Sequence, residues 1–230
     1  MAVILNIETS TNVCSVALTS DGMILCHREA FEGQNHAVLL SDFIKYCFDH
    51  LTEHEMKLDA VAVSIGPGSY TGLRIGLSEA KGICYALKIP LIGIDTLKIM
   101  AVNVMFGKEL TGDELFVPML DARRMEVYTA VYDFSLQTVA SPHPLVLTED
   151  SFSDDEYQGR TLLMFGNGSD KADGFINRAD VRFIPGVVPL AVDMLPLAEQ
   201  AFARKDFLDT AYSVPVYLKE FQATKPKKLF

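Results

Sequence analysis

The chain has 230 residues, of which 49% are hydrophobic and 22% are charged, and this composition is typical of a folded protein rather than a disordered chain. Lys and Arg total 20 against 30 for Asp and Glu, which gives a net charge of -10 and disfavours a chain that binds nucleic acid or an anionic membrane by itself. No apolar run approaches the ~20 residues that span a bilayer, and the first residues lack a basic leader segment, so we expect a cytoplasmic protein with no membrane contact.

The beginning of the chain predicts an antiparallel meander. Segments 3–7, 14–18 and 23–30 are typical of strands, and the polar turn 8–12 joins the first two. Asp21 and Gly22 form a hairpin signal between the second and third strands.

A helix is expected over residues 36–51, because this segment lacks Gly and Pro, has helical periodicity and follows Asn35 as a candidate N-cap. Its apolar side chains occupy an arc of about 200°, roughly twice the width that a surface helix needs. We therefore expect one part of the arc to face the core and another part to bind a partner. The predicted interface residues of this helix are Leu39, Leu40, Phe43 and Cys47.

A short apolar strand at 59–65 leads into a glycine-rich loop and then into a helix that ends near Lys88. Backbone N–H groups at such a junction, together with the helix dipole, favour a phosphate or carboxylate. The candidate anion or nucleotide loop comprises Gly66, Gly68, Ser69, Thr71 and Gly72. A tight turn whose glycines only permit close packing explains the same spacing, and the sequence leaves both interpretations open.

Small residues recur at every fourth position of that helix, at Gly72, Gly76 and Ala80. Glycine inside a helix costs about 1 kcal/mol relative to alanine, so this stripe needs a packing or functional reason. We interpret the stripe, together with Ile83, as a second part of the partner interface, where another helix approaches closely.

The second half of the chain repeats the order of the first. Segments 116–120 and 126–132 predict two strands around a short polar turn, and 161–165 runs into Gly166-Asn167-Gly168 as 59–65 runs into the first glycine loop. This repetition predicts an α/β fold of two duplicated lobes with a cleft between them. Glu8 and Asp121 each end the first strand of a lobe, so we expect them to face one another across the cleft as carboxylates that orient Mg²⁺ or water.

The lobes are expected at 1–105 and 106–218, with the boundary inside segment 100–113 and a basic tail at 219–230. A helix at 195–205 is expected to be able to pack back on the first lobe, and 215–218 is typical of a strand.

Known catalytic and metal motifs are missing from the sequence. No Gly-Lys-Ser/Thr follows the glycines, which excludes a Walker loop, and Ser69 lies outside a G-x-S-x-G elbow. His50 and His54 share a helix face, but the H-E-x-x-H pattern is not met, and the four cysteines form no CxxC pair. We therefore predict no catalytic residue, no metal site and no disulfide framework.

Three blocks of sequence together resemble the bacterial TsaB (YeaZ) family: residues 4–10 (ILNIETS), 64–76 (SIGPGSYTGLRIG) and 121–128 (DARRMEVY). Segments 166–168 and 215–218 fit the family pattern in the same order, so the likeness covers nearly the whole chain. The chain departs from that pattern at Glu8, Tyr70 and Lys219, where the family commonly has Asp, Phe and Arg. The resemblance implies an actin-like/Hsp70-like ATPase fold of two ribonuclease-H-like lobes.

The resemblance also implies a role in making N6-threonylcarbamoyladenosine at position 37 of tRNAs. In that role the chain is the noncatalytic partner of the transferase TsaD, works with the ATPase TsaE, and forms a homodimer when TsaD is absent. Thr96 and Met100 stand where the catalytic relative carries a metal-binding H-x-x-x-H. No cofactor is then required, ATP or ADP binds weakly at most, and tRNA is contacted indirectly or through the basic tail.

The alternative that stays open is an enzyme, either a glycoprotease-like peptidase or a small-molecule ATPase or kinase that acts in the interlobe cleft.

Overall fold

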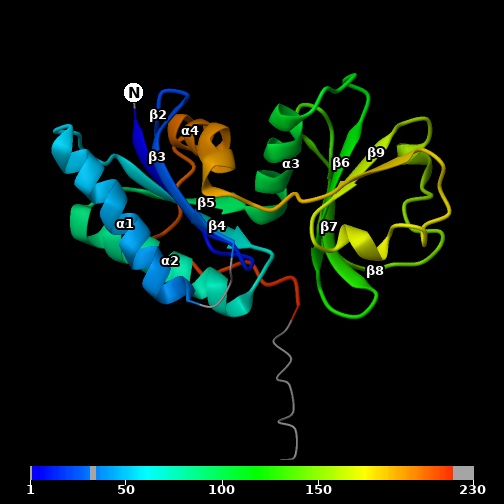
Figure 1. Cartoon of the computed structure of the whole chain (residues 1–230), viewed down its shortest axis with the longest axis horizontal. Coiled ribbons are helices and arrows are strands. Elements are labelled where there is room, and N and C mark those ends of the chain that lie inside the picture. The colour runs from blue at the N-terminus through cyan, green and yellow to red at the C-terminus, as the bar shows by residue number, and fades with distance from the viewer. Residues whose placement is uncertain (1, 32–34, 220–230) are drawn as a thin grey trace, which may run out of the picture.

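A computed structural model describes residues 2–31 and 35–219 and shows two lobes side by side, each built on a five-stranded mixed sheet (Figure 1). The strands of the first lobe are β1 Val3–Glu8, β2 Cys14–Ser20, β3 Met23–Ala30, β4 Ala60–Gly66 and β5 Leu91–Asp95. Those of the second lobe are β6 Leu115–Asp121, β7 Glu126–Tyr132, β8 Thr138–Val146, β9 Leu162–Phe165 and β10 Val181–Ile184.

The two sheets have the same topology. Their strand orders are β3-β2-β1-β4-β5 and β10-β9-β6-β7-β8. In each sheet the first three strands along the chain pair antiparallel, and the last two extend the first strand in parallel. Strand β6 therefore corresponds to β1, and β9 corresponds to β4. The predicted two-lobe α/β duplication is confirmed.

Helices cover both faces of the first sheet. Helices α1 His36–Glu53 and α2 Tyr70–Leu87 pack on one face, while α4 Leu195–Arg204 and the 3₁₀ turn η3 Ala191–Met194 pack on the other. The sheet is thus covered on both sides, which explains why β1 and β4 are almost continuously apolar. Two further 3₁₀ turns, η1 Asp155–Tyr157 and η2 Ser169–Lys171, lie in the second lobe.

Helix α1 shows which part of its wide apolar arc faces the core. Leu40, Ile44, Cys47 and Leu51 follow helical spacing and are buried against the first sheet, with Leu40 and Cys47 fully inaccessible. The assignment of Leu40 and Cys47 to a partner interface was therefore wrong. Both were misplaced because an apolar arc of about 200° does not show which of its residues face the sheet.

The small-residue stripe of α2 also faces inward. A Cβ atom on Gly76 would collide with the Thr9 hydroxyl, one on Gly72 would collide with the Thr9 carbonyl oxygen, and Ala80 is fully buried. The close approach predicted for a partner helix is instead made by the end of β1, so Gly72, Gly76 and Ala80 are not interface residues in this fold. Of the predicted interface set, Leu39, Phe43 and Ile83 remain partly exposed.

Helix α3, Thr96–Gly107, lies between the two sheets (Figure 1). Leu97, Met100 and Val104 pack against the second sheet, whereas Ile99 packs against the first. The predicted lobe boundary after residue 105 thus falls inside a helix that both lobes share.

The last described residues return to the first lobe. The strand expected at 215–218 is wrong, because this segment is not paired as a strand. Val216 N donates a backbone hydrogen bond to Ile65 O over 2.7 Å. Within residues 2–31 and 35–219, no helix is long and apolar enough to cross a membrane. Residues 220–230 of the predicted basic tail lie outside the described residues.

Candidate functional site

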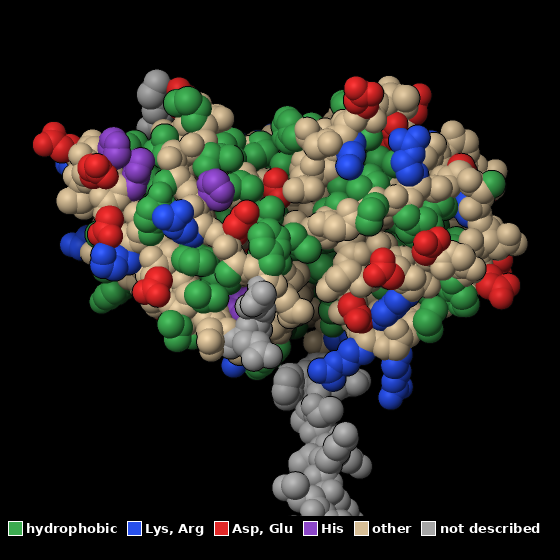
Figure 2. Space-filling view, viewed as in Figure 1, with side chains coloured by type: hydrophobic (Ala, Val, Ile, Leu, Met, Phe, Trp, Pro, Cys, Tyr) green, Lys and Arg blue, Asp and Glu red, His purple; other side chains and the backbone are tan. Residues whose placement is uncertain are grey.

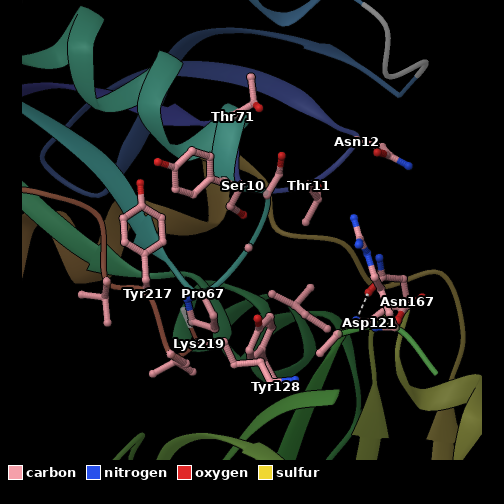
Figure 3. A pocket seen from close by; sticks show the side chains of 18 residues that line it. Ser10, Thr11, Asn12, Pro67, Thr71, Asp121, Tyr128, Asn167, Tyr217 and Lys219 are labelled. Atoms are coloured by element: carbon pink, nitrogen blue, oxygen red, sulfur yellow. Dashed lines mark hydrogen bonds between the residues drawn. The ribbon is translucent and has the colours of Figure 1, made fainter. Parts of the chain in front are cut away.

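A cavity of about 460 Å³ lies between the lobes. Its walls come from the turn after β1, the glycine loop before α2, the β6–β7 turn, and the last residues of the described chain (Figure 3). The lining side chains are largely polar and include Ser10, Thr11, Asn12, Ser69, Thr71, Asp121, Arg123, Tyr128, Asn167, Tyr217 and Lys219. The sequence correctly predicted an interlobe cleft.

The glycine loop is packed against the chain's own first turn. Ser69 N donates to Ser10 O over 2.7 Å, and a Cβ atom on Gly68 would collide with the same carbonyl. Gly66, with a φ of +116°, packs against the carbonyl of Val216. Of the predicted anion loop, Gly68, Ser69 and Thr71 line the cavity, while Gly66 and Gly72 are used for close packing.

Ser69 also begins helix α2. Its hydroxyl accepts a hydrogen bond from Gly72 N over 3.2 Å, which makes it the N-cap of the helix. The N–H and the hydroxyl of Ser69 are therefore both engaged within the protein, which weakens the loop as a phosphate cradle.

The two predicted cleft carboxylates do not face one another. Glu8 is fully buried and does not line the cavity, because β1 continues through Glu8 as a central strand that pairs with Ser15. Its Oε1 accepts from Ser10 N over 2.5 Å. Burial raises the pKa of Glu8 to about 7, against the opposing effect of hydrogen bonds from Ser10 and Ser64.

Asp121 does line the cavity, but it is neutralised by its own lobe. Its Oδ1 accepts from Lys171 Nζ over 2.6 Å and from Arg123 N over 2.5 Å. Desolvation raises the pKa of Asp121, but these hydrogen bonds outweigh it and the net pKa is lowered. The prediction of an opposed Glu8 and Asp121 pair was wrong, since one carboxylate is buried below the cleft and the other is paired at its edge.

Residues 209–219, which we call the strap, run beside α2, and their last part, 216–219, lines one side of the cavity. Lys81 Nζ on α2 donates to the carbonyl oxygens of Ala211 and Ser213, over 2.9 and 3.1 Å. Further along, Arg74 Nε donates to the hydroxyl of Tyr217 over 3.1 Å, and the Tyr217 ring stacks on Tyr70.

The strap ends in the second lobe, because Lys219 Nζ pairs with the Glu126 carboxylate. It therefore joins α2 to the second sheet across the cleft (Figure 3). The sequence did not reveal these contacts, because they join residues far apart in the chain and two of them use backbone carbonyl groups, which leave no residue pattern.

The histidine pair of α1 forms no metal centre in the described chain. The rings of His50 and His54 stack with centroids 4.1 Å apart, and His54 Nδ1 bonds to His50 O. Among residues 2–31 and 35–219 no group of three His, Cys, Asp or Glu side chains could hold a metal ion. Thr96 and Met100 are fully buried at the start of α3, where Met100 packs against Gly166.

Comparison with known proteins identifies the family to which the chain belongs. A family model described as TsaD, tRNA N6-adenosine threonylcarbamoyltransferase, matches residues 30–152. The Escherichia coli (strain K12) protein named tRNA threonylcarbamoyladenosine biosynthesis protein TsaB is 31% identical over 96% of this chain and 96% of its own length. The chain belongs to the TsaB (YeaZ) family. A Bacillus subtilis (strain 168) protein of the same name is 29% identical over 96% of this chain and 95% of its own.

Solved structures of the TsaB family share the fold. YeaZ from Pseudomonas aeruginosa has a TM-score of 0.79 and 28% identity, over 95% of this chain and 100% of that chain. A second P. aeruginosa structure, described as similar to peptidase YEAZ, has a TM-score of 0.81 and 28% identity over the same shares. The expected TsaB family and the expected actin-like ATPase fold of two lobes are both confirmed.

Proposed function

We propose that this TsaB-family chain is a noncatalytic subunit for tRNA threonylcarbamoyladenosine synthesis in the cytoplasm, which pairs with the TsaD transferase and works with the TsaE ATPase. In the absence of TsaD, the same surface pairs two copies of the chain.

The observation that carries the noncatalytic assignment is the position of Glu8. A cleft enzyme that activates water or a metal ion needs carboxylates that reach the bound substrate. Here the Glu8 carboxylate at the end of β1 is fully buried, and its counterpart Asp121 is paired with Lys171. Ser10 and Thr9 fill the space beneath the glycine loop. A cleft arranged in this way favours a structural role over turnover.

The surface that we assign to TsaD is the outer face of α1 and α2. A shallow groove between these helices is lined by Ala37, Tyr70, Thr71, Arg74, Ile75, Ser78 and Glu79. Val38 is 64% exposed beside this groove, and Leu39 and Phe43 are partly exposed on the same helix. Figure 2 shows hydrophobic side chains interspersed with charged ones on this lobe. Such a mixed surface suits a partner helix that buries the apolar part.

The test is co-purification of the chain with TsaD from the same organism, followed by tRNA modification assays in which each subunit is omitted. We expect a stable complex with TsaD and no threonylcarbamoylation when either protein is missing. Modification by TsaD and TsaE at full rate without this chain would contradict the proposal.

Two valines provide a matched pair for the interface. Val38 on α1 and Val146 on β8 are 64% and 61% exposed, so Val38→Glu and Val146→Glu make the same chemical change in different lobes. We expect Val38→Glu to weaken the TsaD complex at least tenfold and Val146→Glu to leave it unchanged. Equal effects of the two variants on the TsaD complex would contradict the assignment of α1 to the interface.

The alternative function is an enzyme acting in the cleft, and the polar cavity of about 460 Å³ is the observation in its favour. It predicts turnover of ATP, of a phosphorylatable small molecule or of a peptide by the isolated chain. Activity that survives removal of TsaD and disappears on Asp121→Asn would favour this alternative.

A further inference from the structure

The turn between β6 and β7 presents two arginines in a conformation that their side chains do not favour. Arg123 and Arg124 have φ angles of 71° and 51°, in the left-handed region, and both side chains are exposed. Such a conformation destabilises residues other than glycine and persists where the surrounding structure or a function demands it. Hydrogen bonds from Arg123 N to Asp121 and from Glu126 N to Arg123 O hold the turn.

The arginines carry charge that their neighbours do not cancel. We define the rim cluster as Asp121, Arg123, Arg124, Glu126, Lys171 and Lys219. Lys171 pairs with Asp121, and Lys219 pairs with Glu126. Within residues 2–31 and 35–219, no carboxylate lies at salt-bridge distance from the guanidinium of Arg123 or Arg124. The rim cluster is therefore positive, although the chain as a whole has a net charge of -10.

The position of the rim cluster favours a long polyanion over a small one. Arg123 and Lys219 line the interlobe cavity, but Arg124 does not, so the two arginines extend from inside the cleft to the outer surface. Figure 2 shows basic side chains on the lower rim beside the cleft. Lys219 is the last described residue, and the sequence continues from it with Lys225, Lys227 and Lys228.

We propose that the rim cluster binds the phosphodiester backbone of the tRNA that the TsaD complex modifies. Arginine presents a planar fork that matches phosphate geometry, and phosphate contacts orient a nucleic acid without reading its sequence. This proposal rests on the proposed function, which supplies the RNA. It revises the sequence-based expectation, because the contact begins on the folded second lobe and is not confined to the tail.

The test uses the complete complex with TsaD and unmodified substrate tRNA, with affinity measured over a series of KCl concentrations. The variant is Arg123→Gln with Arg124→Gln, which removes both charges. We expect affinity to fall on the order of tenfold near physiological salt, and the slope of log K against log salt to decrease by about 1.4–1.8, since each lost phosphate contact changes it by about 0.7–0.9.

The matched control is Arg204→Gln with Lys205→Gln. These two cations are also exposed neighbours, and Lys205 also has a positive φ, of 58°, but they lie at the end of α4 in the first lobe. We expect this control to keep the affinity and the salt slope of the unmodified protein. Arg124→Gly removes one charge and suits the positive φ of this position, so the variant should fold normally. We expect it to decrease the salt slope by about half as much as the double variant does.

Size-exclusion chromatography separates the two proposals. If the unmodified chain does not pair with TsaD, the proposed function fails. If the complex forms and modifies tRNA, but the turn variant keeps full affinity and slope, the rim proposal alone fails. Loss of TsaD pairing in the turn variant would instead identify the rim cluster as a protein contact and would overturn the RNA assignment.

Discussion

The hydroxyl of Thr9 donates a hydrogen bond to the carbonyl oxygen of Gly72 over 2.8 Å, so the end of β1 is held against the first turn of α2. One turn later, the same hydroxyl lies only 2.3 Å from the position that a Cβ atom of residue 76 would take. The lack of side chains at Gly72 and Gly76 is thus what permits strand and helix to approach within one lobe.

This approach predicts opposite effects for two glycines of α2. Gly76→Ala should destabilise the fold by about 1–3 kcal/mol, because the new methyl group overlaps Thr9. Gly82→Ala should stabilise it by about 0.5–1 kcal/mol, because Gly82 is exposed, has no atom near its missing Cβ, and gains helix propensity. Urea unfolding followed by circular dichroism measures both, and a neutral Gly76→Ala would show that β1 and α2 separate easily.

The buried Glu8 predicts a dependence of stability on pH. Its pKa is about 7 in the folded chain, against an ordinary value of 4.5, so the folded state holds the proton more tightly than the unfolded state does. The resulting stabilisation is fully present below pH 4.5 and is lost as the pH rises to about 7. With 1.36 kcal/mol per pKa unit, the loss is about 3 kcal/mol at most.

Glu8→Gln should remove this pH dependence, because glutamine resembles the protonated acid and keeps an acceptor for Ser10 N. We expect the variant to be more stable than the unmodified protein at pH 8 and similar to it at pH 4.5. Glu53→Gln, an exposed change at the end of α1, serves as the control. Parallel stability curves for the Glu8 variant and the unmodified protein from pH 4.5 to 8 would refute the assignment.

ATP should bind the isolated chain weakly. A phosphate at the loop would need Ser69 N as a donor, but this N–H already donates to Ser10 O. Gly68 packs so closely on the same carbonyl that even a Cβ atom would collide with it. Isothermal titration calorimetry should give a Kd above 1 μM for ATP and ADP, which corresponds to a binding free energy weaker than about -8 kcal/mol. A submicromolar Kd would mean that the turn after β1 moves aside.

The strap should loosen when Lys81 can no longer hold it. Lys81→Met keeps much of the aliphatic stem but removes both bonds to the carbonyls of Ala211 and Ser213. We expect amide hydrogen exchange to accelerate in residues 209–219 and to stay unchanged in α4, which packs independently on the first sheet. Unaltered exchange in the strap would show that Val216 and Tyr217 suffice to anchor it.

The sequence revealed elements better than it revealed their orientation. The meander, α1, α2 and the duplicated lobes follow from periodicity, turn residues and internal repetition, which are local properties. Whether Leu40 or Leu39 faces the core depends on where the sheet lies, and a wide apolar arc does not contain that information.

The candidate site shows the same limit. The strand-to-helix junction was recognisable from the sequence, and its Gly68 and Ser69 line the cleft, while anion binding by this loop stays a prediction. Glu8 was wrongly placed there, since its burial depends on β1 pairing with β2 through the last residue of the strand. The strap and the left-handed arginines were not anticipated, because carbonyl contacts and backbone dihedral angles leave little trace in residue types.

The packing of α4 on the first sheet has a consequence for synthesis of the chain on the ribosome. Ala191, Met194 and Ala198 complete a cluster whose other members, including Ile4 and Ile92, belong to the first 100 residues. About 100 residues separate β5 from η3, and at about 5–20 residues per second their translation lasts on the order of 5–20 s. During that interval one apolar face of the first sheet lacks its cover, so the amino-terminal lobe completes its folding only after nearly all of the protein has been made.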